Sequence, residues 1–402
     1  MRRSPRVSRR RLRHVVPQAC VGLIIWLGTF VALECAANVY LKRFAGEKRF
    51  LHYASVRQLK HHPTYAAWYR QIYARHNYLR YYPTPNYQIG KNRHNSLGYR
   101  GEDLPQPKPA GEFWIACLGE STTYTSAVDD YRLSYPAQLE RSLIEQGYRV
   151  RVINAGVGGW STWESLINLE FRVLDLEPDL IIVYHGMNDV YTRLVWPPAA
   201  YRGDNTGAEG PTQEGIVMPN ILEYSTLARA ILLKLRLIQP HYSLRRIMFL
   251  EPETSYGRAF IEQKLNGTYP SGKFTQVSAQ QMLATNRPVY FQRNMEHLVA
   301  IARQHRMRPV LATFGYCPTC SDQPTVSSPE FISALEEFNG VVRALGKTMH
   351  APVFDYARVA SQEPRDYIDG YHTTEEGSRR MGELFARYLI QQRLLSLRSH
   401  TP

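Results

Sequence analysis

Short apolar segments alternate with helix-length segments along the chain from residue 111 onwards. The apolar segments are Phe113–Leu118, Arg149–Ile153, Asp179–Tyr184, Pro309–Phe314 and Pro352–Tyr356. The helix-length segments are Tyr135–Gln146, Trp163–Leu174, Tyr290–His305, Pro329–Met349 and Thr374–Leu395. This alternation predicts an α/β domain, 111–396, in which helices cover both faces of a parallel sheet. Functional side chains in such a sheet gather at the carboxyl ends of the strands.

The composition is that of a globular protein with a substantial core. Hydrophobic residues make up 44% of the 402 residues and charged residues 21%, which excludes a wholly disordered chain, a collagen and a protein with many membrane spans. Five cysteines are too few for a disulfide-rich secreted scaffold. The net charge is +14, but seven arginines within residues 1–14 supply half of it. We therefore expect no nucleic-acid partner.

The N-terminus carries an export signal. After the arginine-rich residues 1–14, Val15–Leu33 contains 19 residues without a charge, and about 17–25 apolar residues suffice for a membrane-spanning helix. The arginines favour a cytoplasmic N-terminus, so we expect a basic cytoplasmic tail (1–14), a transmembrane anchor (15–40) and a juxtamembrane region with a lead-in (41–110). One alternative is a signal peptide cleaved at Cys35-Ala36-Ala37, and another is a buried core helix. The anchor and the signal peptide both place the rest of the chain in the periplasm or outside the cell.

A long insert interrupts the alternation after the third predicted strand. About 100 residues, 190–287, separate this strand from the next predicted helix. The insert contains a segment rich in glycine and proline, Pro197–Pro219, and an apolar helix candidate, Ile221–Ile238. Insertions of this length are usually functional or form a subdomain. We interpret the insert as a lid or a substrate-recognition element, and the alternative is a solvated excursion without a role.

Polar residues and glycines follow the first two predicted strands. Gly119-Glu120-Ser121 comes after the first strand, where a serine behind a tight turn can present its hydroxyl at the edge of the sheet. A helix-capping serine is the alternative. After the second strand, the glycines of Asn154-Ala155-Gly156-Val157-Gly158-Gly159 can leave backbone N–H groups open to a ligand. The alternative there is a glycine-rich turn with a structural role.

Side chains that can complete such a site follow the third and fifth strands. Asn188, in Gly186-Met187-Asn188-Asp189, offers an amide donor, although asparagine is also common in turns and helix caps. Asp369 precedes His372 by three residues after the fifth strand. Such a carboxylate can hold one imidazole nitrogen and leave the other free as a base, and a helix-capping pair is the alternative. His185 can line the pocket beside Asn188 or be a structural histidine.

Taken together, these segments resemble the sequence blocks of the SGNH hydrolases, also called the GDSL esterase/lipase superfamily. The resemblance covers Ile115–Leu389 with the insert excepted. The first block is GESTT rather than a GDS sequence, with Glu120 at the variable middle position, and the other blocks are N-x-G-x-x-G, G-x-N-D and D-x-x-H. The stretch Asn95–Gly101 is similar to one found ahead of the first strand in membrane-anchored bacterial members. We assign this stretch no catalytic role.

The resemblance implies a fold and a mechanism. The fold is a three-layer α/β/α, flavodoxin-like arrangement around five parallel strands. The mechanism is acyl transfer through an acyl-serine, in which Ser121 is the nucleophile, His372 the base and Asp369 the residue that orients the base. The backbone N–H groups of Ser121 and Gly159 and the side-chain amide of Asn188 form the oxyanion hole. Neither a metal nor another cofactor is required.

The resemblance also guides the expected function. We expect a serine ester hydrolase that acts outside the cytoplasm on O-acyl groups of a carbohydrate or lipid, with O-acetyl groups preferred. An O-acyltransferase for an envelope glycan would use the same acyl-serine, and a non-catalytic binding protein would keep the fold alone. Cys317 and Cys320, in the loop after the fourth strand, are expected to form a local disulfide or to remain two free thiols.

Overall fold

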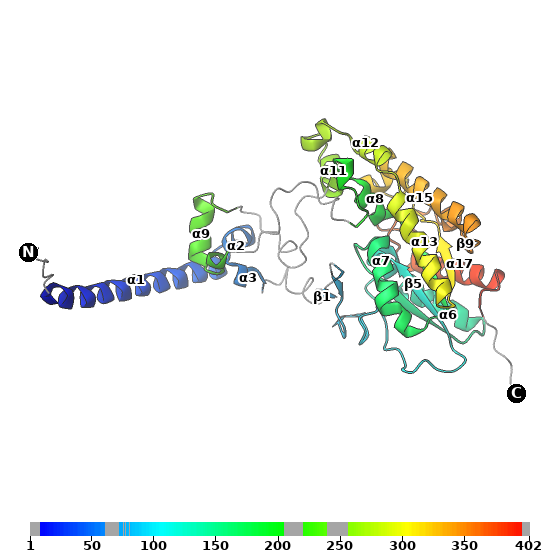
Figure 1. Ribbon diagram of the computed structural model, residues 1–402, viewed down its shortest axis with the longest axis horizontal. Helices are drawn as coiled ribbons and strands as arrows, with labels where there is room; N and C mark the ends of the chain where they lie inside the picture. The colour runs from blue at the N-terminus through cyan, green and yellow to red at the C-terminus, as the bar shows by residue number, and fades with distance from the viewer. Residues whose placement is uncertain are drawn as a thin grey trace, which may run out of the picture. The chain divides into compact units, whose positions relative to one another are not determined.

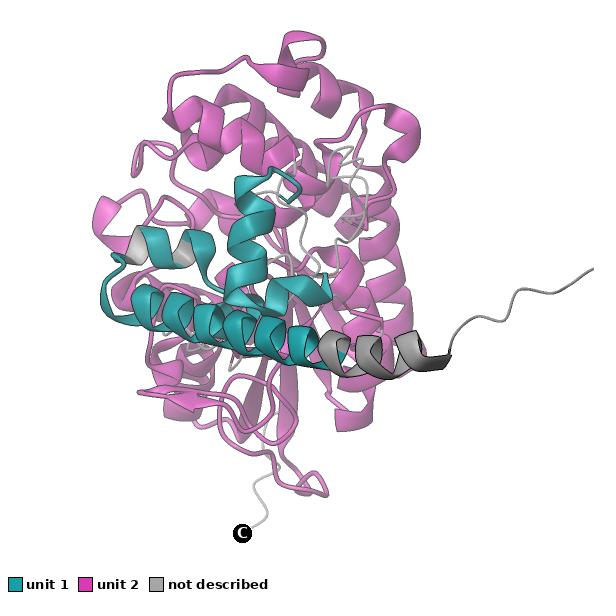
Figure 2. Cartoon of the chain, turned by 90° about the vertical axis from the view of Figure 1, so that its left-hand side faces the viewer, with its two compact units in different colours: residues 1–70, 214–251 teal, residues 71–213, 252–402 magenta. Residues whose placement is uncertain are grey.

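The computed structural model describes residues 9–60, 72–74, 76, 78–79, 81–204, 220–238 and 256–395 (Figure 1). The chain forms two compact units, which are coloured separately in Figure 2. The first unit comprises residues 1–70 and 214–251, and the second comprises residues 71–213 and 252–402. Part of the predicted basic tail, 1–14, lies outside the described residues. The apolar N-terminal segment belongs to the first unit, and the sequence blocks belong to the second.

One five-stranded parallel sheet forms the centre of the second unit. Its strands are β5 (Phe113–Gly119), β6 (Val150–Gly156), β7 (Leu180–Tyr184), β8 (Arg308–Ala312) and β9 (Val353–Phe354). They lie in the order β6-β5-β7-β8-β9, and each neighbouring pair is parallel. Every residue of β5 and β7 is buried, because helices cover both faces of the sheet. The predicted α/β fold with five parallel strands is confirmed.

Helices form the two outer layers of the second unit. They are α6 (Tyr135–Glu145), α7 (Thr162–Asn168), α13 (Val289–Gln304), α15 (Pro329–Thr348) and α17 (Glu375–Gln391). α6 packs against α17, while α13 packs against both α7 and α15. Buried residues recur at helical spacing along α13, for example Phe291, Met295 and Leu298. Amphipathic helices on an apolar sheet therefore produce the three-layer arrangement.

Two small hairpins precede the sheet within residues 72–100, here called the hairpin segment. Strand β1 (Tyr73–Ala74) pairs with β2 (Tyr82–Pro83), and β3 (Gln88–Ile89) pairs with β4 (Asn92–Arg93), both in antiparallel fashion. The buried guanidinium of Arg100 donates hydrogen bonds to the backbone carbonyls of Thr125 and Asp129. Arg100 therefore fastens the hairpin segment to the loop that follows the first strand of the sheet.

The described part of the first unit is helical. Its longest helix, α1 (Arg9–Arg43), contains Cys20–Arg43, the one helical stretch among the described residues that is long and apolar enough to cross a membrane. Three shorter helices accompany it: α2 (Glu47–Tyr53), α3 (Val56–Lys60) and α9 (Thr226–Lys234). A small apolar cluster in this unit contains Leu41, Ala54 and Leu59. By length and composition, the apolar helix fits either a signal peptide or an anchor.

The insert is divided between the two units. Residues 205–219 and 239–255 lie outside the described residues, and they include part of the segment rich in glycine and proline. α9 and the turn before it, Ile221–Tyr224, belong to the first unit. Two later helices, α11 (Tyr256–Leu265) and α12 (Ala279–Thr285), join the core of the second unit through residues such as Phe260 and Met282. The lid remains a prediction.

Candidate active site

Three strands end at one level at the carboxyl edge of the sheet. Gly119, the last residue of β5, pairs with Gly156 of β6 on one side and with Tyr184 of β7 on the other. The Cβ of any larger residue at position 119 would lie 2.5 Å from the Tyr184 carbonyl oxygen. The chain then turns sharply into the short helix α5 (Ser121–Tyr124). Ser121 therefore follows the central one of the three strands.

Ser121, His372 and Asp369 form a chain of hydrogen bonds. Ser121 Oγ lies 2.7 Å from His372 Nε2, and His372 Nδ1 lies 2.7 Å from Asp369 Oδ2. Asp369 Oδ1 also accepts the backbone N–H groups of His372 and Tyr371, at 2.9 Å and 3.3 Å. Burial would raise the pKa of Asp369, but the hydrogen bonds outweigh it and hold the pKa below its ordinary value. A charged Asp369 favours a proton on Nδ1 and leaves Nε2 to accept the serine proton.

The loop after β6 passes beside Ser121. A Cβ built on Gly158 would lie 3.9 Å from the Ser121 Cβ. The Val157 N–H donates to the Gly119 carbonyl at 3.1 Å, which ties this loop to the turn that carries the serine. Gly159 has a φ of +82°, in the region that favours glycine. The glycine predicted from the second block thus lies in the loop next to the serine.

Asn188 joins the segment after β7 to the same loop. It is the second residue of α8 (Met187–Arg193), and its Nδ2 donates to the Trp160 carbonyl at 2.9 Å. An amide nitrogen carries two N–H groups, so this bond leaves one further donor. The structure therefore brings Ser121, Asp369 and His372 into direct contact and connects Asn188 to the loop that contains Gly159.

Glu120 holds the start of α8 from within the core. Its buried carboxylate accepts the backbone N–H groups of Met187 and Asn188, at 3.1 Å and 2.8 Å. Burial raises the pKa of Glu120 to about 8 against the lowering effect of these two bonds, and the neighbouring Asp189 adds to the rise. The resemblance to the SGNH hydrolases places Glu120 at a variable position and does not predict this contact. An acid directly before the serine was the signal that could have identified this supporting role.

His185 lies in a buried polar layer near α7 and α8. Its Nε2 is 2.8 Å from Ser165 Oγ, and its Nδ1 is 3.7 Å from Asp189 Oδ2. Its side chain is 0% exposed, and burial lowers the pKa of His185 to about 3. Burial also raises the pKa of Asp189 to about 7. A neutral, fully enclosed ring has no surface for a substrate, so the geometry fits the structural alternative and not the pocket-lining role.

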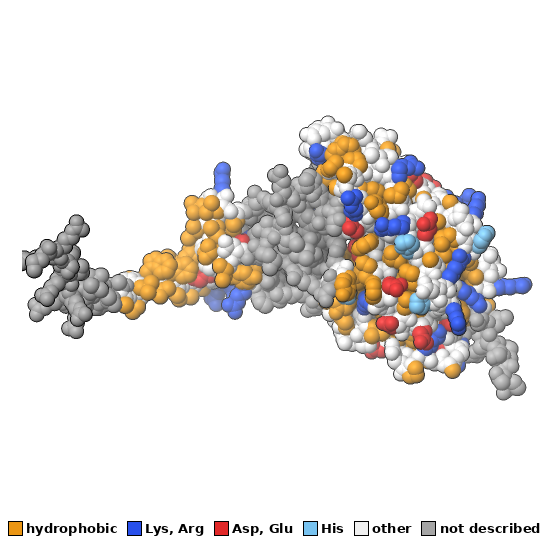
Figure 3. Space-filling model, in the orientation of Figure 1, with side chains coloured by type: hydrophobic (Ala, Val, Ile, Leu, Met, Phe, Trp, Pro, Cys, Tyr) orange, Lys and Arg blue, Asp and Glu red, His pale blue; other side chains and the backbone are white. Residues whose placement is uncertain are grey.

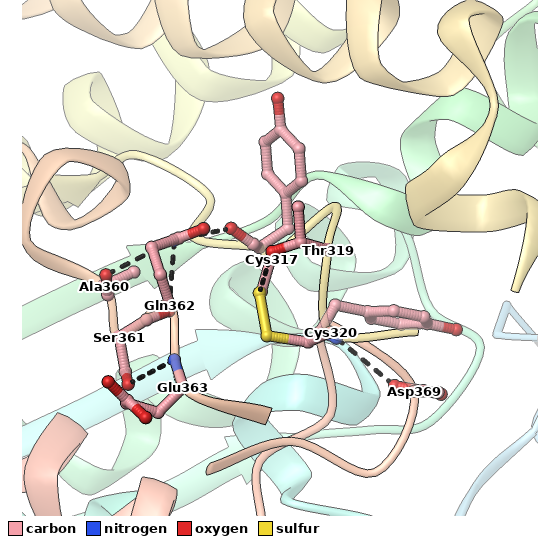
Figure 4. Close-up of a disulfide and its surroundings, with 10 residues drawn as sticks. Cys317, Thr319, Cys320, Ala360, Ser361, Gln362, Glu363 and Asp369 are labelled. Carbon is pink, nitrogen blue, oxygen red and sulfur yellow. Dashed lines mark hydrogen bonds between the residues drawn. A yellow bond between two sulfur atoms is a disulfide. The ribbon is translucent and has the colours of Figure 1, made fainter. Parts of the chain in front are cut away.

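A disulfide joins Cys317 and Cys320 beside the loop that carries Asp369 (Figure 4). The Cys317 N–H donates to the Gly370 carbonyl at 2.7 Å. Gly370 has a φ of +91°, and a Cβ on it would lie 2.9 Å from the Cys317 carbonyl oxygen. Of the two alternatives predicted for these cysteines, the structure contains the disulfide. It packs closely against the loop between Asp369 and His372.

The groups at this edge suit nucleophilic chemistry on a carbonyl carbon. A hydroxyl contacts an imidazole, the imidazole contacts a carboxylate, and backbone and side-chain amides lie nearby. Within the part of the chain that the structure describes, no three or more His, Cys, Asp and Glu side chains gather closely enough to hold a metal ion. The arrangement can therefore deprotonate a serine.

Residues 117–380 match the GDSL-like Lipase/Acylhydrolase family. The chain belongs to this family. The match covers well over half of the chain and includes Ser121, Asp369 and His372. Membership makes the chain an esterase or acylhydrolase of the GDSL/SGNH type. No curated protein matches the chain significantly.

Several solved structures are similar in fold to this member of the family. The crystal structure of TesA is 15% identical, with 70% of this chain and 99% of TesA covered and a TM-score of 0.40. A GDSL-like lipase from Bacteroides thetaiotaomicron is 14% identical, with coverages of 73% and 93% and a TM-score of 0.40. A catalytic mutant of Axe2, an acetylxylan esterase from Geobacillus stearothermophilus, is 12% identical, with coverages of 72% and 97% and a TM-score of 0.38. At these identities the similarity concerns the fold alone.

Replacing Glu120 by glutamine is expected to change the pH dependence of stability. The folded-state pKa of about 8 lies above the ordinary value of 4.5, so the folded chain binds more protons between these two values. The contribution of Glu120 to the free energy of unfolding is therefore greatest below about pH 4.5, and it is lost as the pH rises to about 8. Thermal unfolding of both proteins near pH 5 and pH 8 tests this. The Tm of the wild type minus the Tm of Glu120→Gln should be smaller at pH 8 than at pH 5. The same difference at both pH values would contradict the raised pKa.

Proposed function

We propose that this chain is a serine ester hydrolase that works through an acyl-serine intermediate at Ser121. The observation that carries the proposal is the hydrogen-bond chain from Ser121 through His372 to Asp369, with both links at 2.7 Å. Membership of the GDSL-like Lipase/Acylhydrolase family supports ester hydrolysis. The proposed substrate is an O-acyl group, preferably O-acetyl, on a carbohydrate or a lipid outside the cytoplasm.

In the first half of the reaction, the serine displaces the alcohol of the ester. His372 takes the Ser121 proton while Oγ forms a bond to the carbonyl carbon, and the carbonyl oxygen becomes an oxyanion. The proposed donors to this oxyanion are the N–H groups of Ser121 and Gly159 and the second amide N–H of Asn188. The carbon–oxygen bond to the alcohol then breaks, and the leaving oxygen takes the proton from His372. Asp369 stays ionised throughout and stabilises the imidazolium.

In the second half, water releases the acyl group. His372 takes a proton from the water as its oxygen attacks the acyl carbon, and the tetrahedral intermediate returns to the same donors. Its collapse frees the carboxylic acid and returns the proton from His372 to Ser121 Oγ. A glycan hydroxyl in place of water would transfer the acyl group instead, and product analysis with a sugar acceptor present distinguishes the two outcomes.

The proposed location is a single-pass membrane anchor with a cytoplasmic N-terminus and an exported hydrolase domain. The apolar helix follows an arginine-rich segment, which favours this orientation. The disulfide between Cys317 and Cys320 fits an oxidising compartment. The proposed division is a tail (1–14), an anchor (15–40), a juxtamembrane region with a lead-in (41–110) and a hydrolase domain (111–396) with its insert (190–287).

Replacing Ser121 by alanine is expected to abolish hydrolysis of p-nitrophenyl acetate. The change removes the nucleophile, so the rate should fall by about 10³-fold or more. The measurement is p-nitrophenolate release by the full-length chain in detergent. Ser142→Ala, which changes a half-buried serine on α6, is the control and should keep the wild-type rate. Equal activity in the wild type and Ser121→Ala would refute the serine assignment, and a folded wild type without activity would favour a transferase or a binding role.

Replacing Asn188 by alanine is expected to lower turnover by about 10²–10³-fold, the usual loss for one oxyanion donor. KM should change little, because the donor acts on the charge that develops in the transition state. Steady-state kinetics with the same ester separate kcat from KM. Asn266→Ala, at an exposed asparagine after α11, serves as the matched control. Unchanged turnover in Asn188→Ala would remove this residue from the oxyanion hole.

A further inference from the structure

The insert helix α9 is capped by a side chain of the apolar helix α1. The carboxylate of Glu34 accepts hydrogen bonds from Ser225 Oγ and from the backbone N–H groups of Thr226 and Leu227, each at 2.8 Å. The first N–H groups of a helix have no partner within that helix. Glu34 therefore satisfies the start of α9 from a segment 191 residues away in sequence.

Further polar contacts extend this docking within the first unit. Thr226 Oγ1 lies 3.0 Å from Asn38 Oδ1 and 2.9 Å from Gln58 Oε1. The fully buried Arg229 donates to the His52 carbonyl at 3.1 Å and also to the Ala54 carbonyl. Thr226 and Arg229 of α9 are thus paired with α1, with residues of α2 and α3, and with Ala54 between those two helices. α9 is a folded part of this unit and not a free excursion of the insert.

The docked segment presents apolar side chains to its surroundings. Ile231 and Leu235, one helical turn apart, are 48% and 62% exposed, and Ile221 is 83% exposed. Hydrophobic side chains also line the exposed surface of α1. Figure 3 shows hydrophobic side chains, in orange, over α1 and over α9. An apolar surface of this kind next to a membrane-spanning stretch fits a lipid partner.

The position of Glu34 sets the level of α9 along the apolar run. The uncharged run Val15–Leu33 contains 19 residues and ends directly before Glu34. As a helix it rises about 28 Å, close to the ~30 Å thickness of the hydrocarbon core. Glu34 then lies at the boundary of the membrane, with the basic residues Lys42 and Arg43 beyond it. Short amphipathic helices bury their apolar faces at this boundary.

We propose that α1 is a retained anchor and that α9, with the turn Ile221–Tyr224, is a second contact with the same lipid bilayer, in its interface on the exported side. Cleavage at Cys35-Ala36-Ala37 would separate Glu34 from α9 and leave three donors without their acceptor. The contacts therefore favour the anchor over a cleaved signal peptide, and the insert gains a role in membrane attachment. This inference rests on the proposed location and is independent of the proposed chemistry.

Photo-crosslinking in liposomes tests the lipid contact. The full-length protein carries benzoylphenylalanine in place of Ile231 or Leu235 and is reconstituted with phosphatidylethanolamine and phosphatidylglycerol. The control position is Ile144, an isoleucine of α6 in the second unit that is 51% exposed. Lipid adducts are expected at 231 and 235 and not at 144. Equal labelling at the three positions, or no adducts at 231 and 235, would overturn the proposal.

Two further arms examine the docking and the anchor. Glu34→Ala removes the carboxylate that accepts the first two N–H groups of α9 and should lower the adduct yield at 231 by about 10-fold. Thr29→Ala, at an exposed position of α1, should leave the yield unchanged. Ester hydrolysis, measured in parallel, reports separately on the proposed chemistry. Mass spectrometry of the chain isolated from native membranes should find peptides that contain Glu34. A mature chain that begins after the predicted cleavage site would refute the retained anchor.

A second, independent observation concerns the loop beside Ser121. Tyr81 Oη donates to the Gly158 carbonyl at 2.6 Å. This carbonyl and the Gly159 N–H belong to one planar peptide group and point in opposite directions. The hydroxyl that holds the carbonyl therefore also sets the direction of the N–H. Tyr81 is 5% exposed, and its own carbonyl accepts the indole N–H of Trp160 at 3.2 Å.

We infer that Tyr81 is a positioning residue for the proposed oxyanion hole. A hydrogen bond to the carbonyl both orients the peptide group and polarises it, which makes the N–H on its other side a better donor. Tyr73, whose ring is tilted by 50° relative to that of Tyr81 with the centroids 4.8 Å apart, is also hydrogen-bonded to the Gly158 backbone. Both tyrosines precede the family match, which begins at residue 117. The inference rests on the proposed acyl-serine mechanism.

Replacing Tyr81 by phenylalanine tests this role. One neutral hydrogen bond is lost, so kcat should fall by about 3- to 10-fold while KM stays within about twofold. Inactivation by a p-nitrophenyl phosphonate, whose phosphonyl oxygen enters the oxyanion hole, should slow in parallel. Tyr99→Phe is the matched control, because the buried Tyr99 hydroxyl has no hydrogen-bond partner among the residues that the structure describes. Unchanged kcat in Tyr81→Phe, alongside an inactive Ser121→Ala, would overturn the role of Tyr81 alone. An active Ser121→Ala would instead overturn the proposed function.

Discussion

The candidate site depends on the level at which three parallel strands end. Gly119 pairs with Gly156 and with Tyr184, so the segments after β5, β6 and β7 begin side by side. A shift of one residue in either pairing would move a neighbouring segment by about 3.3 Å, which is more than the hydrogen bonds of the site tolerate. Close packing opposes such a shift, because a Cβ on Gly156 would lie 2.6 Å from the Thr123 side chain. Strand register, held by this packing, thus sets the relative positions of the three segments that carry the site.

Buried carboxyl groups then fix the elements that carry the site. Glu120 accepts two backbone N–H groups at the start of α8, and Asp189 accepts the backbone N–H and the hydroxyl of Thr162 at the start of α7. Burial raises the pKa of each, while the donors around them favour the charged form. The starts of α7 and α8 are therefore held by two buried carboxyl groups, Asp189 and Glu120, whose charge depends on the balance between burial and hydrogen bonding.

Much of this arrangement could be predicted from residue order, and the remainder could not. The five apolar segments predicted the sheet, and parallel strands bring their carboxyl ends to one edge, so Ser121, Asp369 and His372 could be placed together although 251 residues separate the serine from the histidine. The contact between Tyr81 and Gly158 and the cap of α9 by Glu34 depend on the packing of separate surfaces, which leaves no periodic pattern in a sequence. His185 was misleading for a related reason, since its distance in sequence from Asn188 does not reveal that its ring turns into the core.

The cap between Glu34 and α9 has a consequence for handling the protein outside a membrane. A chain shortened to begin after the apolar helix would keep α9 but lose the acceptor for its first N–H groups. The apolar side chains of α9 would then face water without support, which favours association between chains. A soluble hydrolase would therefore have to omit both parts of the first unit, residues 1–70 and 214–251, and not only the N-terminal part. The apolar helix α1 is in effect a folding partner for a segment that the chain reaches almost two hundred residues later.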